Sequence, residues 1–301
     1  DPQVDRHGKP TERTRMSFDT TKTNLKNLLE EVHVGKLQLP DFQRDFVWDE
    51  DGVRSLLASI AKGFPVGALL TLERGGSVEF KPRGLRGTPF ENKPEDECPA
   101  PETLLLDGQQ RMTSLYQSVY SSKPAEVRTA KGKKVRRFFY LDIEAAMSGG
   151  ADFEEAIVTM PEDRIEKGAF GKADGLDLSG AELEYANLFF PLNKALDPIQ
   201  WIFDCAAYWS GRGEDWMQQL LAFQKDVLGQ IQSYAMPVIR LDKSNSREAV
   251  CTVFEKVNVG GKKLDAFELV TAIYAADRFN LREDWFGDPK AGTKGRLELM
   301  R

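Results

Sequence analysis

The feature that most constrains the fold is a short apolar run that ends abruptly in polar residues. Leu104, Leu105 and Leu106 are typical of a buried strand, and Asp107–Arg111 follows at once. Beyond this polar stretch, apolar side chains recur at helical spacing: Met112, Leu115, Tyr116, Val119 and Tyr120. The sequence therefore predicts a strand-to-helix turn that carries a carboxylate, a glycine and a guanidinium.

Other segments of the chain alternate between helical and extended patterns. Apolar stripes with helical periodicity predict helices at residues 25–32 and 53–61, and shorter apolar runs predict strands at 67–72, 138–143 and 237–241. This mixture predicts an α/β (α+β) fold. Residues 81–102 are rich in Pro, Gly and charge without periodicity, so we expect a long surface insertion there and consider it a candidate lid.

Changes in composition suggest three parts. Residues 1–15 are charged and contain Pro, which predicts a flexible arm. Residues 16–145 hold most of the predicted strands and are expected to form an α/β core. Residues 146–301 are richer in helical pattern and in aromatic side chains, and are expected to form a mainly helical lobe.

Composition excludes several classes of protein. A formal net charge of -6 argues against a protein that coats duplex DNA non-specifically, because such binding rests on many cationic contacts to phosphate. The three cysteines, Cys98, Cys205 and Cys251, are too few and too far apart for a disulfide framework or a metal knuckle. No apolar run could span a bilayer, so we expect no membrane partner and a cytoplasmic protein. The ends of the chain suggest a piece of something longer.

The Asp107–Arg111 turn is suited to anions. Backbone N–H groups at a helix start point outward, and an Arg can donate two hydrogen bonds to a phosphate. Asp107 could hold a divalent ion or orient a water molecule. The alternative is that Asp107 only caps the helix while Gln109, Gln110 and Arg111 form a solvated first turn.

Two further blocks carry candidate residues. The segment Leu39–Trp48 places Gln43 and Arg44 among aromatic side chains, which suits a base or a phosphate; alternatively these aromatics belong to the core and Arg44 pairs with a carboxylate. The segment Phe254–Leu264 contains two adjacent glycines but lacks the spacing of a phosphate-binding P-loop. A plain helix-to-helix turn is the alternative there.

A basic run extends from Arg128 to Arg137 and contains six Lys or Arg residues. It is the best candidate for a local DNA contact, although such a run is more often a solvated loop. The residues expected to contact DNA are Lys131, Lys133, Lys134, Arg136 and Arg137.

Taken in order, these blocks resemble the GmrSD-type restriction family. The matching blocks are Phe42-Gln43-Arg44-x-Phe46-Val47-Trp48, Gly63-Phe64-Pro65-x-Gly67, Asp107-Gly108-Gln109-Gln110-Arg111 and Phe254-Glu255-x-x-Asn258-x-Gly260-Gly261-x-x-Leu264. The resemblance covers the chain from about Leu37 to Asp277. It implies a core similar to the ParB and sulfiredoxin-like fold, and nucleotide binding and hydrolysis tied to restriction of modified or phage DNA.

The resemblance also implies roles for individual residues. Asp107, Gln110 and Arg111 would form the catalytic site, with Mg2+ held by Asp107 and a nucleoside triphosphate as substrate. The residues expected to bind the nucleotide are Gln43, Arg44, Gly108, Gln109, Thr113, Asn258, Gly260 and Gly261.

The predicted function is therefore a nucleoside-triphosphate phosphohydrolase that serves an antiviral restriction protein. The alternative is a DNA-recognition module that senses modified DNA without hydrolysis. A redox enzyme is a remote third possibility, because no cysteine lies in a matching block. The chain has only His7 and His33, so no nuclease of the HNH type is expected within it. By analogy with ParB-like switches, a homodimer is expected.

Overall fold

The computed structural model describes residues 16–41, 43, 47–76, 80–149, 153–167, 175–246, 249–250, 252–253, 281–288 and 293–296. Its strands are β1 (Phe18–Asn24), β2 (Leu37–Pro40), β3 (Leu69–Glu73), β4 (Pro82–Arg83), β5 (Thr103–Asp107), β6 (Ala125–Arg128), β7 (Lys134–Asp142), β8 (Ile157–Pro161), β9 (Phe189–Pro191), β10 (Ala235–Leu241), β11 (Gly287–Asp288) and β12 (Thr293–Lys294).

Its α-helices are α1 (Leu25–His33), α2 (Glu50–Ala61), α3 (Gln109–Leu115), α4 (Ile143–Met147), α5 (Ala181–Ala186), α6 (Ile199–Ser210), α7 (Met217–Phe223), α8 (Gly229–Ser233) and α11 (Leu281–Phe286). The shorter turns of helix are η1 (Glu95–Glu97), η2 (Tyr116–Tyr120), η4 (Leu192–Lys194) and η5 (Gln224–Leu228). The mixed α/β class predicted from the sequence is thus confirmed. No described helix is both long and apolar enough to cross a bilayer.

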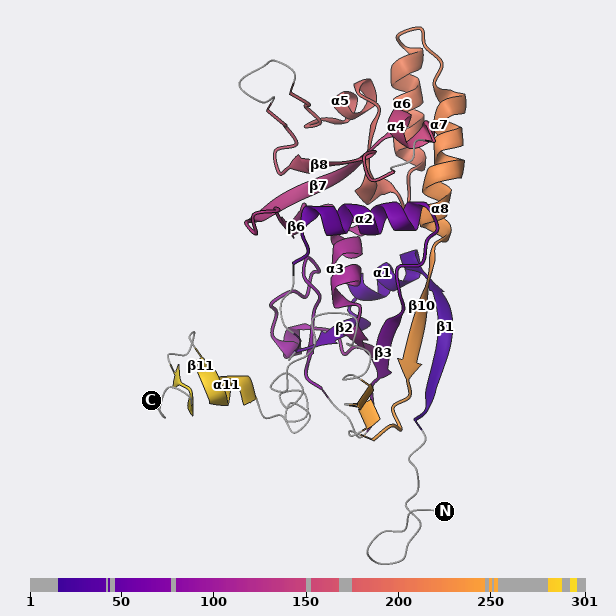
Figure 1. Ribbon diagram of the computed structural model, residues 1–301. Helices are drawn as coiled ribbons and strands as arrows, with labels where there is room; N and C mark the ends of the chain where they lie inside the picture. The colour runs from indigo at the N-terminus through magenta and orange to yellow at the C-terminus, as the bar shows by residue number, and fades with distance from the viewer. Residues whose placement is uncertain are drawn as a thin grey trace, which may run out of the picture.

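Within the described residues, two larger sheets organise the chain (Figure 1). The first sheet has the strand order β1-β10-β3-β5-β2-β4 and mixes parallel with antiparallel pairs. The second sheet is antiparallel, with β7 at its centre between β8 on one side and β6 and β9 on the other. A separate pair, β11 and β12, lies near the end of the chain.

Local sequence explains where the first helices begin and end. The Asn24 side chain accepts a hydrogen bond from the backbone N–H of Lys26 and so caps α1. Gly35 follows this helix with φ +79°, a left-handed conformation that glycine adopts without a steric penalty. The Asp49 side chain caps α2 in the same way. The predicted helices at 25–32 and 53–61 are confirmed.

The strand β5 is buried on both of its faces, as its unbroken apolar run predicts. Leu105 belongs to the large core under the helices, whereas Leu104 and Leu106 pack on the opposite face with Phe80 and Val250. Successive side chains of a strand point to opposite faces, so three consecutive leucines require cover on both sides. The turn at Asp107 therefore follows a strand whose three central leucines are buried.

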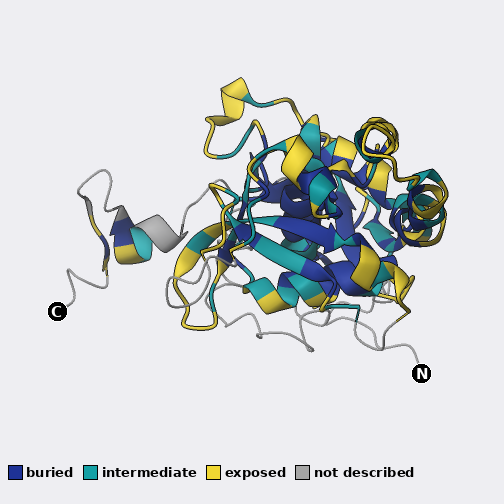
Figure 2. Ribbon diagram, turned by 90° about the horizontal axis from the view of Figure 1, so that it is seen from above, coloured by how far each residue is buried: buried dark blue, intermediate teal, exposed yellow. Residues whose placement is uncertain are grey.

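One hydrophobic core connects the two sheets. The helix α2 lies between them in Figure 1 and contacts α3, α8 and β8. Residues from the first sheet, such as Leu69, and from the second sheet, such as Phe139 and Phe190, belong to the same cluster of buried side chains. Figure 2 shows this arrangement, with buried residues where helices meet strands and exposed residues on the outer helical faces.

The domain boundary predicted near residue 145 stays a prediction. A strand from beyond this boundary nevertheless pairs with strands that precede it. β10, which follows that boundary by almost a hundred residues, lies inside the first sheet between β1 and β3. It pairs antiparallel with β1 and parallel with β3. The first sheet is therefore completed only by a strand from the second half of the chain.

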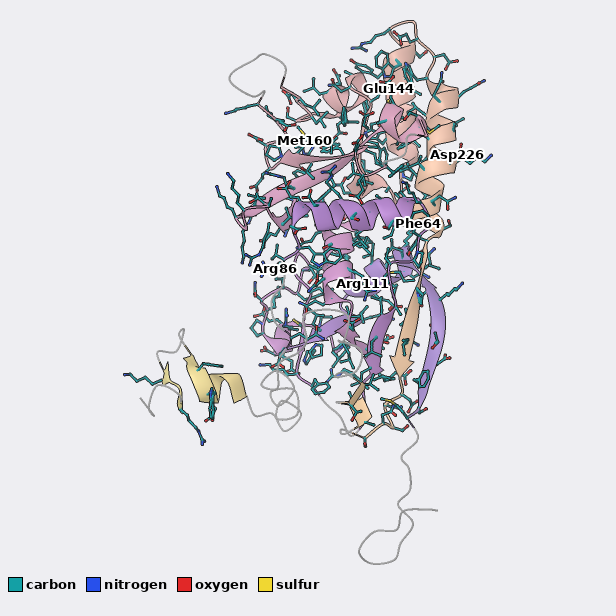
Figure 3. The ribbon with its side chains drawn as sticks, viewed as in Figure 1. Phe64, Arg86, Arg111, Glu144, Met160 and Asp226 are labelled. Carbon is teal, nitrogen blue, oxygen red and sulfur yellow. The ribbon has the colours of Figure 1, made fainter. Side chains whose placement is uncertain are left out.

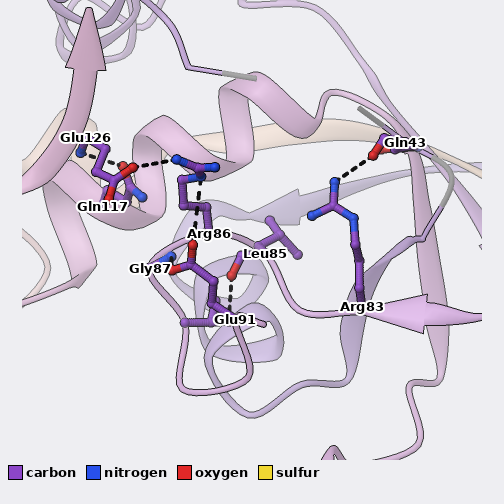
Figure 4. Close-up of polar contacts among 9 residues, drawn as sticks. Gln43, Arg83, Leu85, Arg86, Gly87, Glu91, Gln117 and Glu126 are labelled. Carbon is purple, nitrogen blue, oxygen red and sulfur yellow. Dashed lines mark hydrogen bonds and ion pairs between the residues drawn. The ribbon is translucent and has the colours of Figure 1, made fainter. Parts of the chain in front are cut away.

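Residues 81–102 are more closely integrated than a surface insertion. β4 pairs with β2, and the Leu85 side chain is fully buried. Arg86 lies 2.5 Å from Glu126, and Arg83 donates a hydrogen bond to the Gln43 carbonyl at 2.8 Å (Figure 4). The predicted surface location is wrong at Leu85, because irregular backbone can be anchored by individual side chains that leave no periodic pattern. A role as a lid stays a prediction.

Candidate functional site

The candidate site is the turn between β5 and α3. Gly108 stands at the helix start with φ +95°, and a Cβ atom added to it would lie 2.4 Å from the Leu69 Cδ2 atom. Only glycine fits this position, for both steric and conformational reasons. The sharp turn keeps Asp107 and Arg111 close together, although they are four residues apart.

Arg111 connects this turn to the loop before β3. Its Nη1 atom donates to the Val66 carbonyl and its Nη2 atom to the Ala68 carbonyl, each at 2.9 Å. The same Nη2 atom lies 3.2 Å from Asp107 Oδ2. A guanidinium that binds two carbonyls and a carboxylate fixes the position of the carboxylate (Figure 3 labels Arg111). Arg111 is largely buried, with 16% of its side chain exposed.

The loop held by Arg111 is also supported by Tyr234, which lies between α8 and β10. The Tyr234 hydroxyl donates to the Phe64 carbonyl at 2.7 Å and accepts from the Val66 N–H at 3.3 Å. Burial raises the pKa of Tyr234, while its hydrogen bond from Val66 and the nearby Arg111 charge oppose that rise. Sequence reasoning missed Tyr234. Its place three residues before the predicted strand at 237–241 was the available signal.

Gln43 and Trp48 also form hydrogen bonds with residues of β5 and α3. Gln43 Nε2 donates to the Leu105 and Leu106 carbonyls at 2.8 and 2.9 Å. The Trp48 indole N–H donates to the Gln110 side-chain oxygen. Three of the four sequence blocks therefore meet at one turn, although Trp48 and its partner Gln110 are 62 residues apart in the sequence.

The remaining predicted nucleotide-binding residues divide into two groups. Gln109 and Thr113 lie on α3, and Thr113 is buried. Arg44, Asn258, Gly260 and Gly261 lie outside the described residues, so their predicted roles stay predictions.

Two buried polar atoms near the turn have no hydrogen-bond partner among the described residues. They are Gln43 Oε1 and Thr113 Oγ1. An unsatisfied buried polar atom costs about 1–3 kcal/mol, so such atoms often mark a place where a ligand completes the bonding. Both belong to residues that the sequence predicted to bind a nucleotide.

A magnesium ion fits the turn only with help from a substrate. In the part of the chain that the structure describes, no cluster of three or more His, Cys, Asp or Glu could hold a metal. Asp107 Oδ2 is engaged by Arg111, which leaves Oδ1 as the oxygen that would contact Mg2+. Mg2+ commonly uses one or two carboxylates together with water and substrate phosphates, so this donor set is compatible with a nucleotide-dependent ion.

The basic run lies on the β6–β7 hairpin, at the edge of the second sheet (Figure 1). Arg136 is 3.1 Å from Glu162 and Arg137 is 3.0 Å from Glu50, so both predicted arginines are paired with carboxylates. Lys131, Lys133 and Lys134 are exposed and have no ion pair with any described residue. Of the five residues predicted to contact DNA, the three lysines are therefore those whose charge is not paired within the described part of the chain.

The cysteines give no support to redox chemistry. Burial raises the pKa of the Cys205 thiol to about 12, which keeps it protonated and unreactive at neutral pH. Cys98 is partly exposed, and Cys251 lies outside the described residues.

Comparison with known proteins gives one relative and one family model, each of which covers most of the chain. The chain is 26% identical over 276 residues to MJ0686, an uncharacterized protein of Methanocaldococcus jannaschii. The alignment covers 90% of this chain and 44% of the relative, so the chain spans less than half of that protein's length. A model of the GmrSD restriction endonuclease N-terminal domain matches residues 25–275. The resemblance seen in the sequence blocks is thereby confirmed, and the chain belongs to the GmrSD N-terminal domain family.

Proposed function

We propose that this chain binds and hydrolyses a nucleoside triphosphate at the β5–α3 turn, and that hydrolysis serves a restriction or antiviral defence protein. The observation that carries the proposal is that three sequence blocks meet at the β5–α3 turn, beside two buried polar atoms that have no partner among the described residues. Membership of a restriction family supports the defence role.

The geometry of the turn suggests a separate role for each of its charged residues. Arg111 has its Nη atoms on Val66, Ala68 and Asp107, so it acts mainly by orienting the carboxylate and by adding positive charge nearby. Asp107, through Oδ1, would hold Mg2+ or position the attacking water. Arg44 is then the predicted residue that would contact the phosphates directly.

The remaining polar residues would recognise the nucleotide. Gln43 Oε1 and Thr113 Oγ1 are buried, and each would form a hydrogen bond with the ligand. Gln110 is held by the Trp48 indole and would face the reacting phosphate from a fixed position. A homodimer and the contributions of Asn258, Gly260 and Gly261 belong to the same proposal.

The test is phosphate release from each of the four ribonucleoside triphosphates with Mg2+, by the intact chain and by Asp107→Asn. Loss of a group that stabilises the transition state lowers turnover by about 100-fold or more, which is the result expected for this variant. The matched control is Asp226→Asn, because Asp226 is exposed on η5 and distant from Arg111 in Figure 3. If Asp107→Asn turns over as fast as the control, the site is wrong.

A second candidate function rests on the hairpin. Lys131, Lys133 and Lys134 are exposed and without ion pairs to described residues, which suits contact with a phosphate backbone. In this alternative the chain recognises DNA without hydrolysis. If no triphosphate is hydrolysed but labelled DNA binds, and if replacement of the three lysines abolishes that binding, the recognition function is correct.

A further inference from the structure

A polar cavity lies beside β7 of the second sheet, and no residue of the Asp107–Arg111 turn lines it. It has a volume of about 250 Å³ and is enclosed by the end of η2, by β7 and by η4. Its polar lining includes Gln117, Ser121, Arg137, Arg164, Asn193 and Lys194. None of these residues was singled out for this purpose from the sequence.

The cavity sits at a gap along one edge of β7. On that edge, β6 pairs with β7 as far as Arg137, and β9 resumes the pairing at Tyr140. Phe138 and Phe139 therefore have no strand partner there among the described strands, and both line the cavity. The gap exposes main-chain groups to any molecule that enters.

Positive charge exceeds negative charge around the cavity. Three cationic side chains line it, Arg137, Arg164 and Lys194, against one carboxylate, Glu184. Arg137 is paired with Glu50 and Arg164 lies close to Glu184, so Lys194 is the lining cation that has no ion pair with a described residue. A small molecule that enters this space would be favoured if it carried negative charge.

Glu184 has its own partners and holds Arg164 in place. Its two oxygens accept hydrogen bonds from the Tyr140 hydroxyl at 3.2 Å and the Trp201 indole at 3.0 Å. The Arg164 guanidinium lies 3.8 Å from Glu184 and 4.4 Å from the centre of the Phe138 ring. The side chain of Arg164 remains 33% exposed, so its outer N–H groups are accessible.

Asn193 adds an independent sign that a ligand is missing. Its Oδ1 atom is buried and has no hydrogen-bond partner among the described residues. A hydrogen-bond donor on a bound ligand would remove the energetic cost of this unpaired acceptor. The ligand therefore combines negative charge with at least one hydrogen-bond donor.

We propose that this cavity binds a small phosphate-bearing molecule. A phosphate group carries the negative charge that Arg164 and Lys194 match, and its protonated oxygen or a neighbouring hydroxyl of the ligand donates to Asn193 Oδ1. The uncovered edge of β7 supplies main-chain hydrogen bonds to the same group. This site is independent of the proposed nucleotide site, and its failure would leave that proposal untouched.

The test is calorimetric titration of the full chain with inorganic phosphate and, separately, with ribose 5-phosphate, at matched ionic strength. The variants are Asn193→Asp, which places a negative charge beside the ligand, and Lys194→Ala, which removes an exposed cation. Each is expected to raise the Kd at least about 10-fold. Thermal unfolding without ligand checks that both variants are folded, and Lys225→Ala, a loss of an exposed cation elsewhere, is the matched control.

The outcomes are distinct. Binding of either phosphate probe that is weakened by both variants and unchanged by Lys225→Ala supports the proposal, and tighter binding of ribose 5-phosphate would identify a phosphomonoester rather than free phosphate. Two results would overturn it: no saturable binding up to about 10 mM of either probe, or binding that the Asn193 and Lys194 variants leave unchanged.

Discussion

The β5–α3 turn and the β6–β7 hairpin are both polar stretches of sequence, yet their charges have opposite environments. At the turn, Arg111 is bonded to two carbonyls and to Asp107, and little of it is exposed. At the hairpin, Lys131, Lys133 and Lys134 extend into solvent without ion pairs to described residues. A charge of the first kind stabilises and organises the protein, whereas a charge of the second kind is available to a partner.

Two glycines, one in the loop held by Arg111 and one in the β6–β7 hairpin, show a similar contrast. Gly67 and Gly132 both adopt left-handed conformations, with φ +92° and +77°. A Cβ atom on Gly67 would lie 2.7 Å from Arg111 Nη1, whereas a Cβ atom on Gly132 would meet nothing within 4 Å. The four predictions that follow use this contrast, in order of decreasing effect on the free energy of unfolding.

Removal of the Arg111 side chain should have the largest effect. Arg111→Ala leaves the Asp107 charge and the carbonyls of Val66 and Ala68 without their partner, so the free energy of unfolding should fall by about 3 kcal/mol. Urea denaturation measures this change. The control is Arg212→Ala, since Arg212 also donates to a carbonyl but is exposed. Equal losses in the two variants would show that Arg111 has no special structural role.

Replacement of Gly67 and of Gly132 by Ala should separate the cost of a left-handed backbone from the cost of a steric clash. Gly132→Ala meets only the cost of a left-handed alanine, about 1 kcal/mol. Gly67→Ala adds a contact that displaces the Arg111 guanidinium, for a total loss of at least about 2 kcal/mol. Thermal unfolding of both variants gives the comparison. A smaller loss for Gly67→Ala than for Gly132→Ala would contradict the close approach of Arg111.

A third charge, the buried Glu184, extends the comparison to pH. Burial raises the pKa of Glu184, with its hydrogen bonds and nearby cations opposing the rise. The folded state therefore binds this proton more tightly than the unfolded state, and its contribution to stability is present at low pH and lost as pH rises through the folded pKa.

Glu184→Gln removes that titration. Relative to the unmodified chain, the variant should gain stability as the pH rises through the range in which Glu184 loses its proton in the folded state. Urea denaturation at several pH values measures the difference. Glu182→Gln, on the same helix but exposed, serves as the control and should show no such trend.

The hairpin lysines should have the smallest effect on stability. Joint replacement of Lys131, Lys133 and Lys134 by Ala should change the free energy of unfolding by less than about 0.5 kcal/mol. If the hairpin contacts DNA, the dependence of binding on salt should weaken by about one unit of slope per lysine. A variant lacking three other exposed lysines, Lys22, Lys26 and Lys225, controls for the loss of net charge.

Much of the candidate site could be located from the sequence. The leucines of β5 and the periodic residues after Arg111 placed Asp107 at a strand-to-helix turn, and the structure confirms that turn. The partners of Arg111 could not be predicted, because Val66 and Ala68 lie 45 and 43 residues away and offer only main-chain carbonyls. Main-chain acceptors are present in every residue, so no residue type identifies them.

The cavity beside β7 was equally hidden. Arg164 follows β8, whereas the neighbouring residues Asn193 and Lys194 belong to η4, and nothing in the local patterns connects these two segments. The cavity exists because β6 and β9 leave a gap along β7, which is a property of how three strands pair.

The sequence by itself determined the secondary structure around the turn, the mixed α/β class and the family. Those properties depend on periodicity, capping residues and short motifs, which are local along the chain. Three properties appeared only in the tertiary structure: Arg111 bonds to groups of the same chain, three hairpin lysines are exposed without an ion pair to a described residue, and β10 completes the first sheet. The physical reason is that pairing of charges and strands depends on distance in space, which the fold sets for residues far apart in sequence.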